Sequence, residues 1–304
     1  MRIAVCGGNG FVGRALTIDL IGAGHTVTWL SHRPGRHTMA PGVAEVRFDP
    51  AVPEGSWADA VRSAHAVVNL SGHPIASRWN PEVKRLLRDS RINTTRALVD
   101  CIAATPEGGS RPAAFVCAAG VGYYGDRGDD VLDETEPPGT DWLAELAVQW
   151  EAEAVRARDL GCRTVRVRTG LALGDEGLLP KMLLPMRLFV GGPIGDGHQW
   201  MPWVHIDDVV GAYRFVIEND TVDGAVNACA PEPVKMRDFA AALGKAVGRP
   251  SWLPVPAFAL KLVLGEVAPY TLMSQRAQPE ELTRSGFRYR FASIDGALED
   301  LLSH

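Results

Sequence analysis

The stretch that decides the fold of this chain is VCGGNGFVGRALTIDL, residues 5–20. Its glycines Gly7, Gly10 and Gly13 recur every third residue, after a short apolar run and at the start of a helix-like segment over 11–23. In a dinucleotide site the first such glycine permits a tight turn, the second lets the backbone approach a pyrophosphate, and the third allows close helix packing. The helix N-terminus adds free N–H groups and partial positive charge. The motif therefore predicts a dinucleotide site, with a ligand-free structural turn as the alternative.

The segments that follow alternate between apolar runs and amphipathic stretches. This rhythm predicts a parallel sheet with helices on both faces, and right-handed crossovers then give a doubly wound α/β fold. We expect strands at 3–6, 26–30, 44–48, 66–70, 113–118 and 163–167, and helices at 11–23, 80–104 and 141–160.

The rhythm breaks after residue 175. A loop rich in glycine and aromatic residues is followed by the sequence HIDDVVGAYRFVIEND, which predicts a helix capped by an Asp. From residue 231 the chain is punctuated by prolines and is expected to form a smaller, mostly helical lobe. We therefore predict a nucleotide-binding domain over 1–230, with a substrate loop at 175–205, and a C-terminal lobe over 231–304.

Composition narrows the class of protein. The 304 residues include 46% hydrophobic and 22% charged residues, which is ordinary for a globular protein. The net charge is -5 and no basic block occurs, which argues against nucleic-acid or anionic-membrane binding. No signal peptide and no apolar stretch of about 18 residues is visible. Five scattered cysteines favour buried thiols in a reducing cytoplasm and give no metal-binding pattern.

The end of the second expected strand indicates which dinucleotide binds. An NAD site usually has an Asp or Glu there, which accepts from the ribose 2′-hydroxyl. This chain instead has Ser31, His32 and Arg33, a hydroxyl and two potentially cationic groups that suit a 2′-phosphate. NADP is therefore favoured over NAD, although Arg33 could also be an ordinary solvated surface charge.

The fourth expected strand ends in NLSGHPI, residues 69–75. Ligands of open α/β sheets lie outside the carboxyl ends of the strands, so Leu70, Ser71 and Gly72 should run along the cofactor ribose. Phe11 and Val12, which open the first helix, belong to the same predicted cofactor site.

Several motifs together resemble the extended short-chain dehydrogenase/reductase superfamily. They are GGNGFVGRAL, VNLSGHPIASRWN, SRINTTRALV, GVGYYG, VRTGLALG, GGPIGDGHQWMPWVHIDD and VPAFALKLVLGE, which span nearly the whole chain. The combination is similar to an atypical branch, the YfcH-like NAD(P)-dependent epimerase/dehydratase family with a C-terminal DUF1731-type domain. This resemblance implies a Rossmann-like fold that binds NADP, and it implies that Arg91 contacts the cofactor. A helix-surface ion pair is the alternative for Arg91, and the resemblance implies no particular substrate.

The catalytic residues typical of that superfamily are absent. Its members use a Ser at the end of strand five and Tyr-x-x-x-Lys on the next helix, where cationic groups stabilise the phenolate and allow proton transfer near neutral pH. Here the strand ends in Ala118, Ala119 and Gly120, and the helix at 141–157 has no Tyr or Lys. Glu145 and Gln149 are the expected occupants of the Tyr and Lys positions.

Other polar residues could serve the site. Tyr123 is the candidate catalytic acid facing the nicotinamide, whereas Tyr124 fits a structural turn and Arg168 fits an ion pair with an acid. Lys181, Gln199, Trp200 and His205 are tentative substrate contacts. For Trp200 the alternative is packing, and for His205 it is ordering of the substrate loop.

Two functions follow. The first is an NADP-dependent oxidoreductase or epimerase that acts on a small polar metabolite by an atypical route. The second is a non-catalytic NADPH-binding sensor or scaffold. We expect no nucleic-acid or membrane partner and no metal, and a homodimer is a possible assembly.

Overall fold

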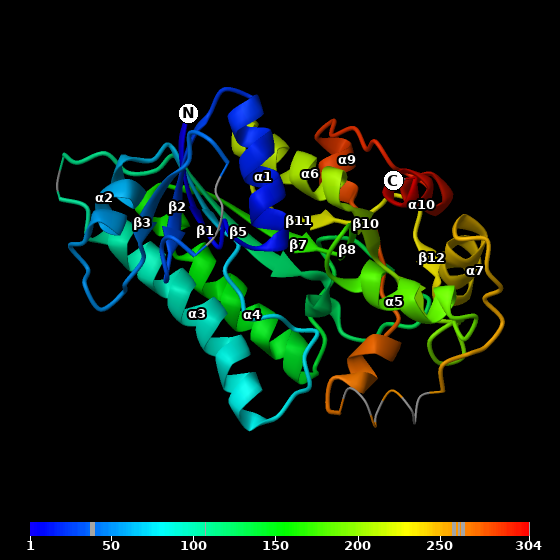
Figure 1. Ribbon diagram of the computed structural model, residues 1–304. Coiled ribbons are helices and arrows are strands. Elements are labelled where there is room, and N and C mark those ends of the chain that lie inside the picture. Colours follow the sequence, from blue (N-terminus) through cyan, green and yellow to red (C-terminus); the bar gives the residue numbers. More distant parts are fainter. Residues whose placement is uncertain (37–39, 107, 257–259, 261, 263–264, 304) are drawn as a thin grey trace.

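A seven-stranded parallel sheet forms the centre of the protein (Figure 1). The computed structural model describes residues 1–36, 40–106, 108–256, 260, 262 and 265–303. The strand order β11-β7-β5-β4-β1-β2-β3 confirms the doubly wound, Rossmann-like fold. The strands are β1 (Arg2–Cys6), β2 (Thr26–Ser31), β3 (Ala44–Arg47), β4 (Ala66–Asn69), β5 (Ala114–Gly120), β7 (Arg163–Thr169) and β11 (Gly224–Ala228).

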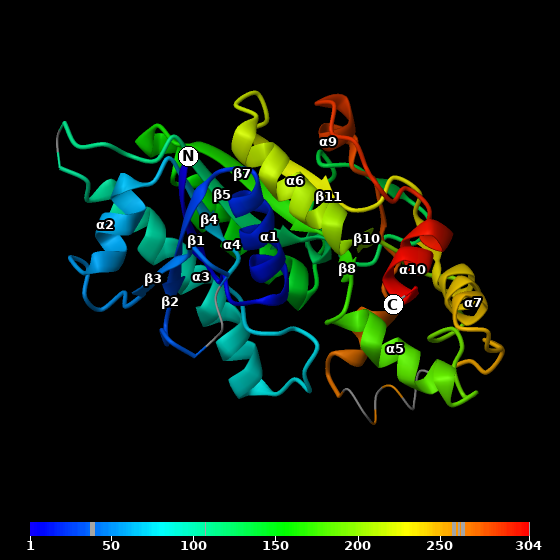
Figure 2. The same ribbon diagram turned by 45° about the horizontal axis from the view of Figure 1, so that its top comes forward.

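Helices cover both faces of the sheet because successive strand residues point to opposite sides. Ile3 and Val5 join the core beneath α1 (Phe11–Gly22) and α6 (Ile206–Glu218). Ala4 and Cys6 join the opposite core. That second core is covered by α2 (Ser56–Ser63), α3 (Pro81–Ala103) and α4 (Trp142–Val155), as Figures 1 and 2 show.

A third core supports a lobe beside the β11 edge of the sheet (Figure 2). Its helices are α5 (Leu178–Arg187), α7 (Met236–Ala246) and α10 (Ile294–Leu302), and α9 (Glu280–Arg284) lies nearby. Short strand pairs link its segments: β8 (Leu171–Leu173) with β10 (Trp203–His205), β9 (Trp200–Met201) with β12 (Val234–Lys235), and β6 (Val131–Leu132) with β13 (Arg276–Ala277).

Two element predictions need correction. The chain re-enters the main sheet as β11, which was not expected because its sequence GAVNA lacks a bulky apolar run. The helix expected at 141–160 ends at Val155, and a 3₁₀-helix over Arg158–Leu160 follows. Gly161 then turns the chain with a φ of 85°. The 3₁₀ turn before it keeps a helix-like residue pattern, which is why the sequence predicts a longer helix. Two further 3₁₀-helices are η1 (Val121–Tyr124) and η3 (Ala268–Leu272).

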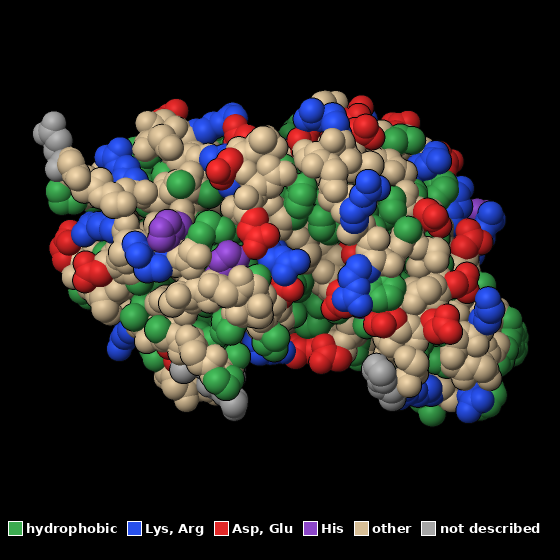
Figure 3. Space-filling view, turned by 90° about the horizontal axis from the view of Figure 1, so that it is seen from above, with side chains coloured by type: hydrophobic (Ala, Val, Ile, Leu, Met, Phe, Trp, Pro, Cys, Tyr) green, Lys and Arg blue, Asp and Glu red, His purple; other side chains and the backbone are tan. Residues whose placement is uncertain are grey.

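Charged side chains of both signs are scattered over the face seen in Figure 3, without a continuous basic area. Within the described residues, no helix combines the length and apolar character needed to cross a membrane.

Candidate functional site

The glycine turn is as tight as the motif predicts. Gly7 has a φ of +81°, and a Cβ on it would lie 2.8 Å from the carbonyl carbon of Leu70. A Cβ on Gly13 would lie 2.3 Å from the carbonyl oxygen of Gly7, whereas Gly10 precedes α1 as its N-cap. Gly7 and Gly13 therefore cannot carry a side chain, and the turn brings the N-terminus of α1 against the end of β4.

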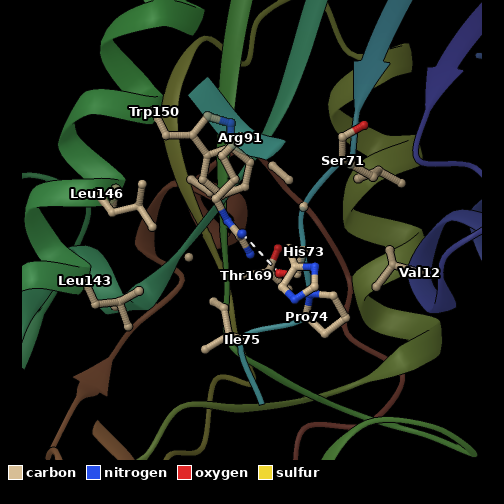
Figure 4. Close-up of a pocket in the computed structure, with 18 of the residues that line it drawn as sticks. Val12, Ser71, His73, Pro74, Ile75, Arg91, Leu143, Leu146, Trp150 and Thr169 are labelled. Atoms are coloured by element: carbon tan, nitrogen blue, oxygen red, sulfur yellow. Dashed lines mark hydrogen bonds between the residues drawn. The ribbon is translucent and has the colours of Figure 1, made fainter. Parts of the chain in front are cut away.

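A cavity of about 350 Å³ lies at the carboxyl ends of β4, β5 and β7 (Figure 4). It gathers five of the predicted cofactor residues, namely Val12, Leu70, Ser71, Gly72 and Arg91. The loop after β4, the ends of β5 and β7, and one side of α4 complete it. These further lining residues are His73, Pro74, Ile75, Ala118, Ala119, Gly120, Gly122, Leu143, Leu146, Ala147, Trp150, Thr169, Gly170 and Tyr213.

The end of β2 lies on the other side of the glycine turn from this cavity. The strand order places β2 beside β1, and β4 on the opposite side of β1. Ser31 is buried, whereas His32 and Arg33 are exposed. The His32 ring meets the edge of Phe48 with centroids 5.2 Å apart. The two exposed basic side chains therefore follow directly on β2, on the side of β1 away from the cavity.

Arg91 is buried and has no ion-pair partner among the residues that the structure describes, so the alternative of a helix-surface ion pair is wrong. The residue is 7% exposed, and its Nη1 donates to the carbonyl oxygens of His73 and Leu87, each at 3.1 Å. Its guanidinium lies over the ring of Trp150, 5.2 Å from the centroid. No carboxylate forms a salt bridge with it in the described part of the chain. Burial lowers the pKa of Arg91 to about 10, as expected for a cation without a counter-ion.

The side of α4 that faces the cavity differs from our prediction. Glu145 and Gln149 are exposed, and the Gln149 amide oxygen accepts from Arg88 at 2.7 Å. Leu146 and Trp150 line the cavity at the same four-residue spacing, as Figure 4 shows. Successive residues of a helix point about 100° apart, so a shift of one residue moves a side chain off the cavity face. Glu145 and Gln149 each precede a cavity residue by one position. The two α4 residues that line the cavity at this spacing are therefore apolar.

Tyr123 does not line the cavity. Its ring lies beneath the guanidinium of Arg168, 3.5 Å from ring centroid to Cζ. Arg168 is buried and donates to both carboxylate oxygens of Glu151, at 2.8 and 3.0 Å, which agrees with the ion-pair interpretation. The hydroxyl of Tyr124 donates to Asn227 at 2.7 Å and accepts from Arg168 at 3.0 Å, which agrees with a structural role.

The tentative substrate residues also lie outside the cavity lining. Lys181 on α5 is exposed and donates to the carbonyl oxygen of Ala76 at 3.3 Å. Gln199 is buried and donates to Ile194 at 2.9 Å. Trp200 donates to Asp129 at 2.6 Å.

His205, and not an Asp, caps α6. Its Nδ1 accepts from the backbone N–H of Asp207 at 3.0 Å, and its ring stacks on Phe291 with centroids 3.9 Å apart. Asp208 instead accepts from the backbone N–H groups of Arg290 and Phe291, at 2.8 and 3.0 Å. The sequence favoured Asp because it is a common capping residue, but this Asp joins α6 to the C-terminal segment.

Comparisons with known proteins settle the family. A model of the NAD dependent epimerase/dehydratase family matches residues 3–229. The chain belongs to this family. The resemblance inferred from the motifs is thereby confirmed, and a model for a domain of unknown function, DUF1731, matches residues 255–301. Part of the VPAFALKLVLGE motif in that region lies outside the described residues.

Several epimerase-family proteins are similar over the full chain. The chloroplastic SDR39U1 homolog of Arabidopsis thaliana is 37% identical, with 99% of this chain and 87% of that protein covered. Epimerase family protein YfhF of Bacillus subtilis is 36% identical, with 100% and 98% covered. The crystal structure of human epimerase family protein SDR39U1 (isoform2) with NADPH has a TM-score of 0.89 and 35% identity, and all of both chains is covered.

Sequence reasoning did not single out most of the further cavity residues of this epimerase-family chain, among them His73, Trp150 and Tyr213. His73 extends the loop after β4, and its position next to Gly72 was a usable signal. Trp150 lies one turn beyond Leu146 on α4. Tyr213 reaches the cavity from α6, and its hydroxyl lies 3.4 Å from the Thr169 hydroxyl. An apolar helix face gives no local sign of such a role, and burial raises the pKa of the Tyr213 phenol above its ordinary value.

Proposed function

We propose that this chain binds NADP(H). The pyrophosphate would lie at the N-terminus of α1, the 2′-phosphate beside Ser31, His32 and Arg33, and the nicotinamide half in the cavity between the loop after β4 and α4. The observation that carries this proposal is the end of β2, which offers a hydroxyl and two basic side chains but no carboxylate. A structurally similar human protein was solved with NADPH.

The residues present fit such a cofactor. The turn has no room for a Cβ at Gly7 or Gly13, which leaves the backbone N–H groups of α1 accessible to a phosphate. The cavity beyond it contains Arg91, a buried cation for which the described residues provide no salt-bridge partner. The proposed contacts are Gly7, Gly10, Phe11, Val12, Gly13, Ser31, His32, Arg33, Leu70, Ser71, Gly72 and Arg91.

Substitution of Arg33 tests the choice of nucleotide. A charge-assisted hydrogen bond contributes about 1.5–3 kcal/mol, so Arg33→Ala should weaken NADPH binding by about 10- to 100-fold and leave NADH binding unchanged. Affinities would be measured from the fluorescence of the bound reduced nicotinamide. Arg85→Ala, an exposed arginine on α3, serves as the control. Equal wild-type affinities for NADPH and NADH would contradict the proposal, as would an Arg33→Ala variant that binds NADPH normally.

We further propose that residues 1–230, including the loop 175–205, hold the cofactor and that residues 231–304 close the site. The reaction would be that of an NADP-dependent oxidoreductase or epimerase on a small polar metabolite. A non-catalytic NADPH sensor or scaffold is the second candidate. The apolar α4 wall of Leu143, Leu146, Ala147 and Trp150 favours this candidate, because it offers no group for proton transfer. The five cysteines are free and buried, which supports a reducing, cytoplasmic setting.

An assay with a panel of carbonyl compounds and sugar nucleotides separates the two candidates. For an enzyme that uses Tyr123 as its acid, absorbance of NADPH should fall with one of these compounds, and Tyr123→Phe should slow turnover by about 10²- to 10⁴-fold. Tyr270→Phe is the matched control in the C-terminal lobe. For a sensor, NADPH would bind tightly without turnover, and a partner protein would be captured only in its presence. Turnover unaffected by Tyr123→Phe would remove Tyr123 from the mechanism.

A further inference from the structure

The charge on the cavity lining is positive and is not balanced by a carboxylate of the lining residues. Of the residues that line it, only Arg91 carries a permanent charge, and neither Asp, Glu nor Lys is among them. His73 and Tyr213 are the other titratable side chains on the lining. The nearest buried acid on α4, Glu151, is already paired with Arg168 and Arg166. The positive charge of Arg91 therefore has no compensating carboxylate at the cavity.

The local structure holds the Arg91 guanidinium in a fixed place. Its two hydrogen-bond acceptors among the described residues are backbone carbonyls, which orient the group without neutralising it. The ring of Trp150 covers one side. Gly72 leaves room on another, since a Cβ there would lie 3.0 Å from Cζ of Arg91. A pKa near 10 keeps the group protonated at neutral pH.

The strand order of the sheet indicates which half of a bound dinucleotide would lie next to Arg91. The glycine turn follows β1, and the proposed 2′-phosphate residues follow β2 on one side of it. The cavity lies on the other side, over the ends of β4, β5 and β7. A cofactor whose pyrophosphate lies at the turn and whose adenosine half lies over β2 must direct its nicotinamide into the cavity.

We propose that the cavity selects the oxidation state of the nicotinamide, and that Arg91 makes it bind NADPH more tightly than NADP⁺. This inference rests on the proposed NADP(H) binding. The oxidised ring carries a positive charge, which the guanidinium repels across a poorly screened, largely apolar cavity. The reduced ring is neutral and meets no such repulsion.

The expected preference is on the order of tenfold, which corresponds to about 1.4 kcal/mol of repulsion. Two like charges several ångströms apart in a protein can supply that much. Tighter binding of the reduced form raises the reduction potential of the bound couple. For a two-electron couple, a tenfold ratio corresponds to about 30 mV. The bound cofactor would thus be held in its reduced form.

Binding measurements on the full chain test this inference without any substrate. Calorimetry would give dissociation constants for NADPH and NADP⁺ in the wild type, in Arg91→Gln and in the control Arg88→Gln. Arg88 is on the same helix but is exposed and bonded to Gln149. The wild type and the control should prefer NADPH about tenfold, and the ratio should fall toward one in Arg91→Gln.

A second pair of variants covers the case in which Arg91→Gln does not fold. Leu146→Glu leaves Arg91 in place and adds a carboxylate to the cavity wall, so it should reduce or reverse the preference, whereas Leu146→Gln should not. Equal wild-type affinities, or a ratio that neither Arg91→Gln nor Leu146→Glu changes, would overturn the inference. If Arg91 instead pairs with a cofactor phosphate, Arg91→Gln would weaken both forms equally. Failure of both forms to bind would instead refute the proposed function itself.

Discussion

Two buried arginines show how little a residue type alone says about its role. Arg168 and Arg91 are 2% and 7% exposed, and both are close to aromatic rings. Arg168 is bound by the carboxylate of Glu151, whereas the hydrogen-bond acceptors of Arg91 within the described residues are backbone carbonyls. The sequence left the ion-pair interpretation open for both, because the decisive partner comes from another element. Pairing makes Arg168 structural, and its absence makes Arg91 available to a ligand.

Removal of the Glu151 charge should therefore destabilise the fold. Glu151 accepts hydrogen bonds from both Arg166 and Arg168, and its loss leaves a buried cation without compensation. Breaking a buried pair on one side costs about 3–5 kcal/mol, so Glu151→Gln should lower the free energy of unfolding by about that amount in urea denaturation. Glu299→Gln, at an exposed site on α10, should change it by less than about 0.5 kcal/mol. A loss below about 1 kcal/mol for Glu151→Gln would contradict this account.

At the scale of the element, the sequence predicted where α4 and α6 lie better than how each is turned or capped. Apolar periodicity located both helices. It did not settle whether Glu145 and Gln149 or Leu146 and Trp150 face the cavity. The side of α4 that lines the cavity and the side that packs in the core are both apolar, so periodicity alone does not distinguish them. The cap of α6 was misassigned because His and Asp both accept hydrogen bonds from backbone N–H groups.

The His205 cap should make stability depend on pH. Burial lowers the pKa of His205 below its ordinary value, so the folded state holds a neutral imidazole whose Nδ1 accepts from Asp207. The contribution is present above the unfolded-state pKa and is lost as pH falls. Urea unfolding of the wild type at about pH 7.5 and about pH 5 should show this loss, and His205→Asn should reduce it.

Comparison of His205→Asn with a second variant, His205→Ala, separates capping from titration. His205→Asn keeps a side-chain acceptor, whereas His205→Ala removes it and should cost about a further 1 kcal/mol of unfolding free energy at neutral pH. Identical pH profiles in the wild type and His205→Asn would show that other groups, such as the neighbouring Asp300, govern the dependence.

At the scale of the whole molecule, local sequence signals predicted six strands of the main sheet but not the seventh, β11. The glycine turn and the alternation of strand and helix predicted β1, β2, β3, β4, β5 and β7 in sequence order. Completion of the sheet by β11 depends on pairing with β7, which lies far back along the chain. Contacts such as the ion pair between Lys84 and Glu266 likewise join α3 to the C-terminal segment, and no short window of sequence contains them.

The position of β11 has a consequence for synthesis on the ribosome. The chain leaves the sheet after Thr169 and returns only at Gly224, so β7 remains an edge strand while the intervening segment emerges. An edge strand presents unpaired N–H and C=O groups that other nascent chains could join. Its proper neighbour arrives late, and such distant pairing is slow. The β7 edge is therefore most exposed to wrong pairing during the part of translation between the synthesis of β7 and that of β11.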